Sequence, residues 1–281
     1  MNIFYIIIIL LLISYTIYIY NFETYASEIQ SSNIKNKKII FTVTTFFDFK
    51  KENKFNVFCN GIDSILKFHP NIYNTIDFYI INEYSDKPLD NWKNKINQTY
   101  PFIKFIQKTE KDKGQGKSLN LILDIIQDYT YWIHWEEAWF ATREFLYDAI
   151  EIMNNNNITQ LQFTQEYDQT HWINKPCRCY NFNTNNYCIL DYSIEEYPKI
   201  NIYKDFTHDD WMNVNWPLYS IRPSINRVSD YNFGKFVITP ELWPLKFEIE
   251  FGERWMEHNY VKGIFKNGPV TRNSTHVSTY K

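Results

Sequence analysis

The spacing of apolar residues changes repeatedly between alternating and helical patterns along residues 39–153. Runs of β-branched and aromatic residues predict buried strands, and apolar residues at every third or fourth position predict amphipathic helices. The predicted strands are 39–46, 76–83, 102–108 and 129–135, and the predicted helices are 55–68, 90–97, 116–128 and 142–153. Strands that alternate with helices predict βαβ units around a mostly parallel central sheet flanked by helices.

The second half of the chain has a less regular pattern. Residues 160–165 predict a strand, and a long aromatic-rich stretch with few turn or helix signals follows them. A last helix is predicted for residues 245–258, and no internal repeat is visible.

The N-terminus differs from the rest because residues 3–20 carry no charge and the first acid is Glu23. About 20 apolar residues are needed to cross a bilayer, so this run is just long enough. A cleaved signal peptide would need a basic start and small residues at a cleavage site, which the segment lacks. The pattern therefore predicts a transmembrane signal-anchor (1–22), a polar stem (23–38) and a large folded domain (39–281). A chain organised in this way is a single-pass membrane protein.

Two signals for the side of the membrane on which the domain lies point in opposite directions. Three lysines between positions 35 and 38 follow the span, which favours a cytosolic domain. Three N-glycosylation sequons would instead suit a lumenal domain, and they lie at Asn97, Asn157 and Asn273.

Composition excludes one class of function and leaves the cysteines undecided. The formal net charge of -3 gives no electrostatic reason to expect nucleic acid as a partner. A zinc site would need a clearer pair of C-x-x-C knuckles and a fourth ligand. One disulfide and free thiols are both compatible with the four cysteines, which are Cys59, Cys177, Cys179 and Cys188.

Two adjacent acids, Glu136 and Glu137, interrupt the aromatic run at the end of the predicted strand 129–135. Burying a charge costs several kcal/mol unless a partner compensates it. Parallel sheets bind ligands beyond the carboxyl ends of their strands, which is where these acids stand. They either stabilise the N-terminus of the following helix through its dipole or bind a cation or a polar substrate.

The segment from Gly114 to Ser118 places glycines and Lys117 just before a predicted helix. Backbone donors, the helix dipole and an ammonium group together favour a diphosphate at such a position. The spacing is not that of a Walker A loop, and ordinary capping by Ser118 is the alternative.

Several sequence blocks occur in an order that resembles the nucleotide-sugar glycosyltransferases of the GT-A fold, especially viral and microbial members related to the large inverting family 2. The blocks are TVTTF, FYIINEYSD, YPFIKFIQKTEKDKGQGKSLNLILD, YWIHWEEAWF, NVNWPLYSIRPSINR and FEIEFGERW. The resemblance covers roughly residues 39–281, and its viral members add a host endomembrane or a viral membrane as alternative locations. It implies an α/β, Rossmann-like GT-A domain that moves a sugar, with inversion, from a nucleotide-sugar donor to a glycan or glycoprotein acceptor.

The resemblance also implies roles for individual residues. The donor-binding positions that match the family's blocks are Thr44, Thr45, Asn82, Glu83, Gly114, Lys117, Ser118, Asn120 and Glu136. A divalent cation, Mn²⁺ or Mg²⁺, is implied as cofactor, because carboxylates suit these ions and the ion neutralises a diphosphate leaving group. The implied metal ligands are Glu137 and, in the C-terminal segment, His276.

The chain departs from the family's pattern at the metal motif. The family's Asp-any-Asp triplet corresponds to Glu136, Glu137 and Ala138, so alanine stands where the metal-bound Asp is expected. Either Glu137 takes over as ligand, or the activity needs no metal, or the protein is an inactive relative. Asn82 and Glu83 also replace a family Asp-Asp pair, and Asp209 with Asp210 is a rival site for the metal.

An inverting transferase needs one general base that deprotonates the acceptor hydroxyl. With Arg254 aligned to the family's arginine, Glu248 falls at the position of the catalytic Asp, and Glu250 is the second candidate. Two surface acids on an amphipathic helix are the plain alternative. A catalytically silent pseudo-glycosyltransferase that acts as a binding or scaffold protein, and another α/β nucleotide-binding transferase, are the competing functions.

Overall fold

The computed structural model describes residues 12–16, 37–47, 53–85, 90–164, 177–190, 219–238 and 246–272. By its internal contacts the chain divides into two units, residues 1–38 and residues 39–281. In the first unit, the described residues 12–16 are helical.

The structure corrects the prediction of a single-pass membrane protein. Among the described residues, no helix combines the length and the apolar character that a membrane crossing requires. The rest of the predicted span and most of the predicted stem lie outside the described residues.

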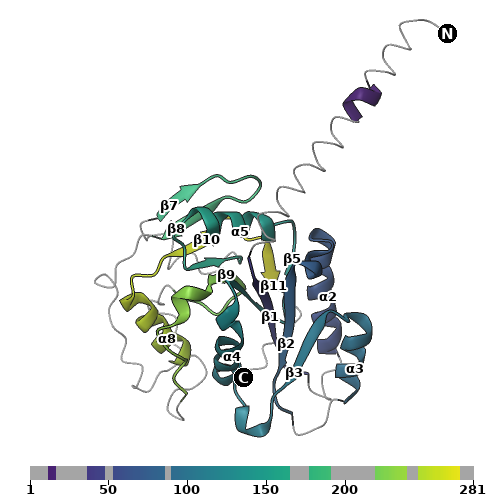
Figure 1. Cartoon of the computed structure of the whole chain (residues 1–281), viewed down its shortest axis with the longest axis vertical. Helices are drawn as coiled ribbons and strands as arrows, with labels where there is room; N and C mark the ends of the chain where they lie inside the picture. Colours follow the sequence, from purple (N-terminus) through teal and green to yellow (C-terminus); the bar gives the residue numbers. More distant parts are fainter. Residues whose placement is uncertain are drawn as a thin grey trace, which may run out of the picture. The chain divides into compact units, whose positions relative to one another are not determined.

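The second unit is a mixed α/β domain built around one large sheet (Figure 1). Its described strands are β1 (Ile39–Thr45), β2 (Ile76–Asn82), β3 (Ile103–Gln107), β4 (Tyr131–Glu136), β5 (Trp139–Ala141), β6 (Gln160–Gln162), β7 (Cys177–Tyr180), β8 (Tyr187–Leu190), β9 (Ser224–Arg227), β10 (Lys262–Phe265) and β11 (Val270–Arg272). Its described α-helices are α2 (Asn53–Phe68), α3 (Asp90–Thr99), α4 (Gln115–Ile125), α5 (Leu146–Asn155) and α8 (Lys246–Glu257).

The strand order of the large sheet is β3-β2-β1-β4-β9-β6-β10-β8-β7. The first four strands in this order, β3, β2, β1 and β4, are parallel to one another. Strand β9 lies between β4 and β6 and is antiparallel to both. A hairpin of β7 and β8 forms the far edge, next to β10. A second, two-stranded sheet joins β5 to β11.

The regular first half of the domain confirms the sequence prediction, with each predicted strand and helix between residues 39 and 155 present. The predicted strand 160–165 is the shorter β6, and the helix predicted for 245–258 is α8. The pattern missed the short strands β5 and β7 to β11. Strands of three or four residues are too short to show a period.

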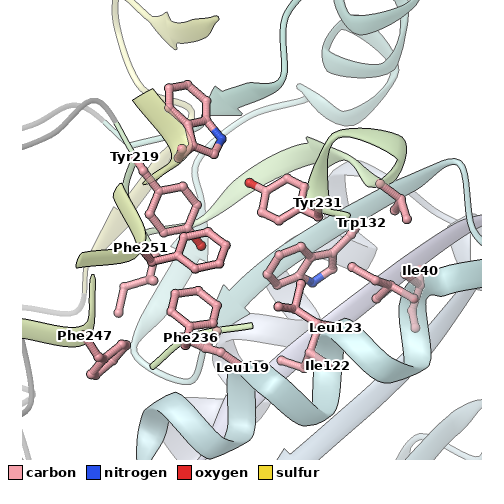
Figure 2. Packing of buried hydrophobic residues seen from close by; sticks show 14 of the residues in the cluster. Ile40, Leu119, Ile122, Leu123, Trp132, Tyr219, Tyr231, Phe236, Phe247 and Phe251 are labelled. Atoms are coloured by element: carbon pink, nitrogen blue, oxygen red, sulfur yellow. The ribbon is translucent and has the colours of Figure 1, made fainter. Parts of the chain in front are cut away.

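Helices α4 and α8 cover one face of the sheet and share its main apolar core. This cluster combines Ile40 and Trp132 of the sheet with Leu119 and Ile122 of α4 and Phe251 of α8 (Figure 2). Its aromatic rings meet closely: Phe236 stacks on Phe251 with centroids 3.8 Å apart. The core therefore fixes α8 against the face of the sheet that carries Trp132.

The opposite face packs against α2 and α5. Trp135 of β4 contacts Phe41 of β1 and Phe145 beside α5 through ring packing. Helix α2 approaches β5 so closely that a Cβ on Gly61 would lie 2.8 Å from the carbonyl oxygen of Trp139. Glycine at this position lets the helix backbone contact the segment that follows the two acids.

Candidate active site at the carboxyl ends of the parallel strands

The strand order reverses direction at β1, which lies between β2 and β4. In open α/β sheets the ligand site lies outside the carboxyl ends of the strands at such a switch point. The four parallel strands end at Thr45, Asn82, Gln107 and Glu136, so these residues mark the candidate site.

Asn82 joins the ends of three neighbouring strands. Its Oδ1 accepts hydrogen bonds from Thr45 Oγ1 (2.9 Å) and from the Phe47 backbone N–H (3.0 Å). Its Nδ2 donates to Gln107 Oε1 at 2.8 Å, and the residue is fully buried. An aspartate could accept the first two bonds but could not donate the third, so asparagine suits this position. These contacts favour a positioning role for Thr45 and Asn82 over direct contact with a donor.

A buried lysine that the sequence analysis did not single out organises the adjacent turn. Lys108 Nζ donates to Glu83 Oε2 (2.9 Å), to the Gly114 carbonyl oxygen (2.8 Å) and to Ser118 Oγ (2.7 Å). Glu83 Oε2 also accepts from the Gly114 N–H at 3.1 Å. Burial lowers the pKa of Lys108, and the Glu83 carboxylate opposes that change. Three predicted donor-site residues, Glu83, Gly114 and Ser118, are thereby brought together at the start of α4.

Gly114 occupies the N-cap of α4 with φ 112°, a backbone conformation that favours glycine. Ser118 lies inside the helix and is buried, so it binds Lys108 and does not cap the helix. In the sequence, Lys108 is only the last residue of the predicted strand 102–108, and nothing there indicated that its side chain is buried.

Three other predicted donor-site residues have structural partners. Lys117 donates to the carbonyl oxygen of Lys111, which closes the turn before α4. The Asn120 side chain forms two hydrogen bonds with the backbone of Phe236. Its Nδ2 donates to the Phe236 carbonyl oxygen at 2.9 Å, and its Oδ1 accepts from the Phe236 N–H at 2.7 Å. Thr44, half-buried on β1, donates to the carbonyl oxygen of Trp135 at 3.5 Å. Asn120 thus joins α4 to the segment that packs on α8.

Glu137, the predicted metal ligand, is directed into the protein. Its Oε1 lies 3.0 Å from Lys54 Nζ, and its Oε2 accepts from the Phe46 N–H at 2.8 Å. Both side chains of the ion pair are buried, and the Lys54 ammonium also lies 4.8 Å from the ring centroid of Phe46. Glu137 therefore ties the end of β4 to α2 and to the end of β1.

Glu136 takes the opposite direction, toward the N-terminus of α4. Its Oε1 accepts from Gln115 Nε2 at 3.3 Å, and its Oε2 accepts from Trp139 Nε1 at 3.0 Å. Burial raises the pKa of Glu136, while the Trp139 hydrogen bond and the positive charges of Arg272 and Arg222 oppose the increase. Of the two adjacent acids, Glu136 is the one beside the glycine turn.

Glu248 lies in the first turn of α8 and is 4% exposed. Its Oε1 accepts a hydrogen bond from the Ile221 N–H at 2.9 Å. Burial raises the pKa of Glu248 to about 7, against the opposing effects of that hydrogen bond and of Arg222, and the Glu136 charge raises it further. A carboxylate with such a pKa is suited to accept a proton near neutral pH.

Arg222 connects the two acids. Arg222 lies two residues before β9, which pairs antiparallel with β4 and places Ser224 opposite His134. The backbone of Ile221 donates to Glu248, and Arg222 acts electrostatically on both carboxyl groups. The fold thus brings the donor-site candidate and the base candidate to one arginine.

The other predicted residues separate from this cluster. Glu250 forms a two-point ion pair with Arg254, at 2.6 Å to Nε and 2.8 Å to Nη2, which favours a structural role. The remaining candidates lie outside the described residues; they are His276, Asp209 and Asp210.

Comparison with known proteins finds similarity in structure alone. No known family and no curated protein matches this sequence. The mannosyltransferase PcManGT from Pyrobaculum calidifontis, solved with GDP-Man and Mn²⁺, aligns with a TM-score of 0.55 and 10% identity over 87% of this chain and 59% of its own. The UDP complex of S. aureus TarS 1–349 aligns with a TM-score of 0.49 and 13% identity over 81% of this chain and 57% of its own.

The similarity to PcManGT establishes the fold, and at 10% identity it extends to the architecture only. The described domain has the GT-A glycosyltransferase fold that the resemblance implied, with its sheet and the candidate site at the carboxyl ends of the strands. This chain spans less than two thirds of the length of the two solved structures.

Proposed function

We propose that this protein is a glycosyltransferase that moves a sugar from a nucleotide-sugar donor to a glycan or protein acceptor. The observation that carries the proposal is the convergence of Glu136 and Glu248 on Arg222 within a GT-A domain. One acid lies at the strand end where a donor is expected, and the other is a buried carboxyl group with a pKa of about 7.

Glu248 is the proposed general base. It accepts the proton of the acceptor hydroxyl while that oxygen attacks the anomeric carbon, and the bond to the nucleoside diphosphate breaks on the opposite side. This geometry inverts the anomeric configuration. The pKa of about 7 allows Glu248 to be ionised at neutral pH and still to take up the proton in the transition state.

The start of α4 is the proposed diphosphate site. The helix has 11 residues, and its N-terminal dipole favours a negative ligand. Lys108, Glu83 and Gly114 hold the turn before it in one conformation. Such a turn offers its backbone to the phosphates without rearranging when the donor binds, which is a source of catalytic preorganisation.

Glu136 is the residue that would hold a divalent cation. Mg²⁺-type ions in phosphate-transfer sites commonly take one or two carboxylates together with substrate phosphates and water, so one available acid is compatible with such an ion. Glu137 is the poorer ligand because its charge is compensated in a buried ion pair with Lys54, whereas the oxygens of Glu136 accept from the neutral side chains of Gln115 and Trp139. Ala138 supplies no oxygen from its side chain. When bound, the ion would neutralise charge on the diphosphate. The cation is supported further by the Mn²⁺ found in PcManGT.

A panel of UDP- and GDP-sugars, tested with Mn²⁺ and candidate glycan acceptors, distinguishes the possible functions. We expect release of free nucleoside diphosphate, and loss of that release in Glu248→Gln but not in the matched variant Glu250→Gln. Release of pyrophosphate would indicate a nucleotidyltransferase instead.

A catalytically silent relative remains the second candidate, because Ala138 provides no carboxylate at the family's metal position. It predicts binding without turnover, seen as a nucleotide-induced thermal shift with no product. Absence of both turnover and thermal shift would refute the proposed donor site altogether.

A further inference from the structure

Three of the four cysteines meet on the hairpin at the edge of the sheet. In the register of β7 and β8, Cys179 lies opposite Cys188, and Cys177 is two residues from Cys179 on the same strand. Side chains two residues apart on a strand share a face, so the backbone pairing places three sulfur atoms on one side of the hairpin. Figure 1 shows this hairpin beside β10.

The sulfur atoms are close enough to bind one ion. Cys179 and Cys188 form a disulfide, and Cys177 carries a free, exposed thiol. The Sγ atoms of Cys177 and Cys179 are 3.9 Å apart, and all three Sγ atoms lie within 4.8 Å of one another. A tetrahedral zinc thiolate site with Zn–S bonds of about 2.3 Å requires sulfur atoms roughly 3.8 Å apart.

We propose that the three cysteines form a thiolate site for Zn²⁺ that is closed while the disulfide is intact and opens when it is reduced. In the reducing step, a thiol reductant passes two electrons and two protons to the Cys179–Cys188 bond. The products are two protein thiols and one disulfide of the reductant. The ion then displaces the thiol protons into solvent and binds three sulfur atoms.

The position of the hairpin supports this chemistry. Cys177 and Cys179 are exposed and Cys188 is partly exposed, so both a reductant and an ion can reach the cluster. Three soft thiolates select zinc over magnesium or manganese, which prefer oxygen ligands. Water occupies the fourth position of the tetrahedron when no further side chain binds. Either the disulfide or the ion cross-links β7 to β8, so the hairpin stays closed in both redox states.

The test uses the full chain in two states, oxidised and reduced with a thiol reductant that is then removed under anaerobic conditions. Zn²⁺ is titrated into each by calorimetry in two buffers of different ionisation enthalpy, which reports both the stoichiometry and the protons released. We expect one equivalent of Zn²⁺ to bind the reduced chain with proton release, and no binding to the oxidised chain.

Cysteine variants identify the ligands. Cys177→Ser should weaken Zn²⁺ binding by more than the roughly 10- to 100-fold that loss of an outer-shell partner costs, because it removes a direct ligand. Cys59→Ser is the matched control, since Cys59 is the other free cysteine in the described residues and lies on α2. Failure of the reduced chain to bind Zn²⁺, equal binding by the oxidised chain, or equal affinities of the two variants would each overturn the proposal.

Discussion

Replacement of Glu248 by glutamine is expected to stabilise the protein at alkaline pH. The carboxyl group has a pKa of about 7 in the folded chain, where burial is the main cause, against a usual value of 4.5. The folded state therefore holds this proton more tightly than the unfolded state. Between pH 4.5 and 7 the folded chain binds more protons than the unfolded chain, so the free energy of unfolding falls as the pH rises.

The difference of about 2.5 pKa units corresponds to roughly 3 kcal/mol at 1.36 kcal/mol per unit. This cost is absent below pH 4.5 and complete above pH 7. Glutamine is neutral at every pH and its Oε1 can still accept from the Ile221 N–H. Glu248→Gln should thus match the wild type near pH 4.5 and exceed its free energy of unfolding by about 3 kcal/mol at pH 8.

Urea unfolding at pH 4.5 and pH 8 measures this difference directly. Glu250→Gln is the control, because it makes the same chemical change in the same helix at a partly exposed ion pair, which contributes at most about 1 kcal/mol. The glycosyl-transfer assay should show the opposite order, with Glu248→Gln slower by about 10²- to 10⁴-fold. A stability difference between wild type and Glu248→Gln that does not change with pH would refute the reasoning.

Four further changes test the site and the helix packing beside it. Glu136→Gln should lower Mn²⁺-supported turnover by about 10²- to 10³-fold with little loss of stability, because it removes charge stabilisation at the donor. Glu137→Gln should instead lower the free energy of unfolding by about 3–5 kcal/mol, since it removes the negative charge of the buried ion pair with Lys54. Urea unfolding and enzyme kinetics of both variants separate the two roles, and equal behaviour of the two variants would contradict them. Arg222→Gln removes a positive charge that lowers the pKa of Glu248, so the acid limb of the pH–rate profile should move to higher pH, and an unmoved limb would rule out that coupling. Gly61→Ala places a Cβ 2.8 Å from a backbone carbonyl oxygen of β5 and should cost about 1–3 kcal/mol in urea unfolding, whereas an unchanged stability would show that α2 can move away.

The sequence by itself determined the βαβ half of the domain. Strands such as β1 and helices such as α4 bury a face that repeats with a clear period, so local spacing was sufficient to find them. The same spacing also indicated where those strands end. From these ends, Glu136, Asn82 and the glycine turn were expected at one edge of the sheet. The proposed base, Glu248, came from the family resemblance alone.

Only the tertiary structure decided what each of these side chains contacts. Glu136 and Glu137 are adjacent and chemically identical, yet one lies beside Gln115 and the other beside Lys54. Adjacent side chains near a strand end point to opposite faces, and the elements that cover those faces come from distant parts of the chain. The sequence pattern does not record which element covers which face.

The same reason explains the burial of Lys108 and the meeting of three cysteines on one hairpin. A lysine is normally exposed, and its burial here depends on Glu83, Gly114 and Ser118 arriving together. The short strands β7 and β8 form because their backbones pair across the sheet edge, an interaction that leaves no period in four residues. Long-range pairing, invisible in local sequence, therefore decided the partners of the acids and the cysteine cluster.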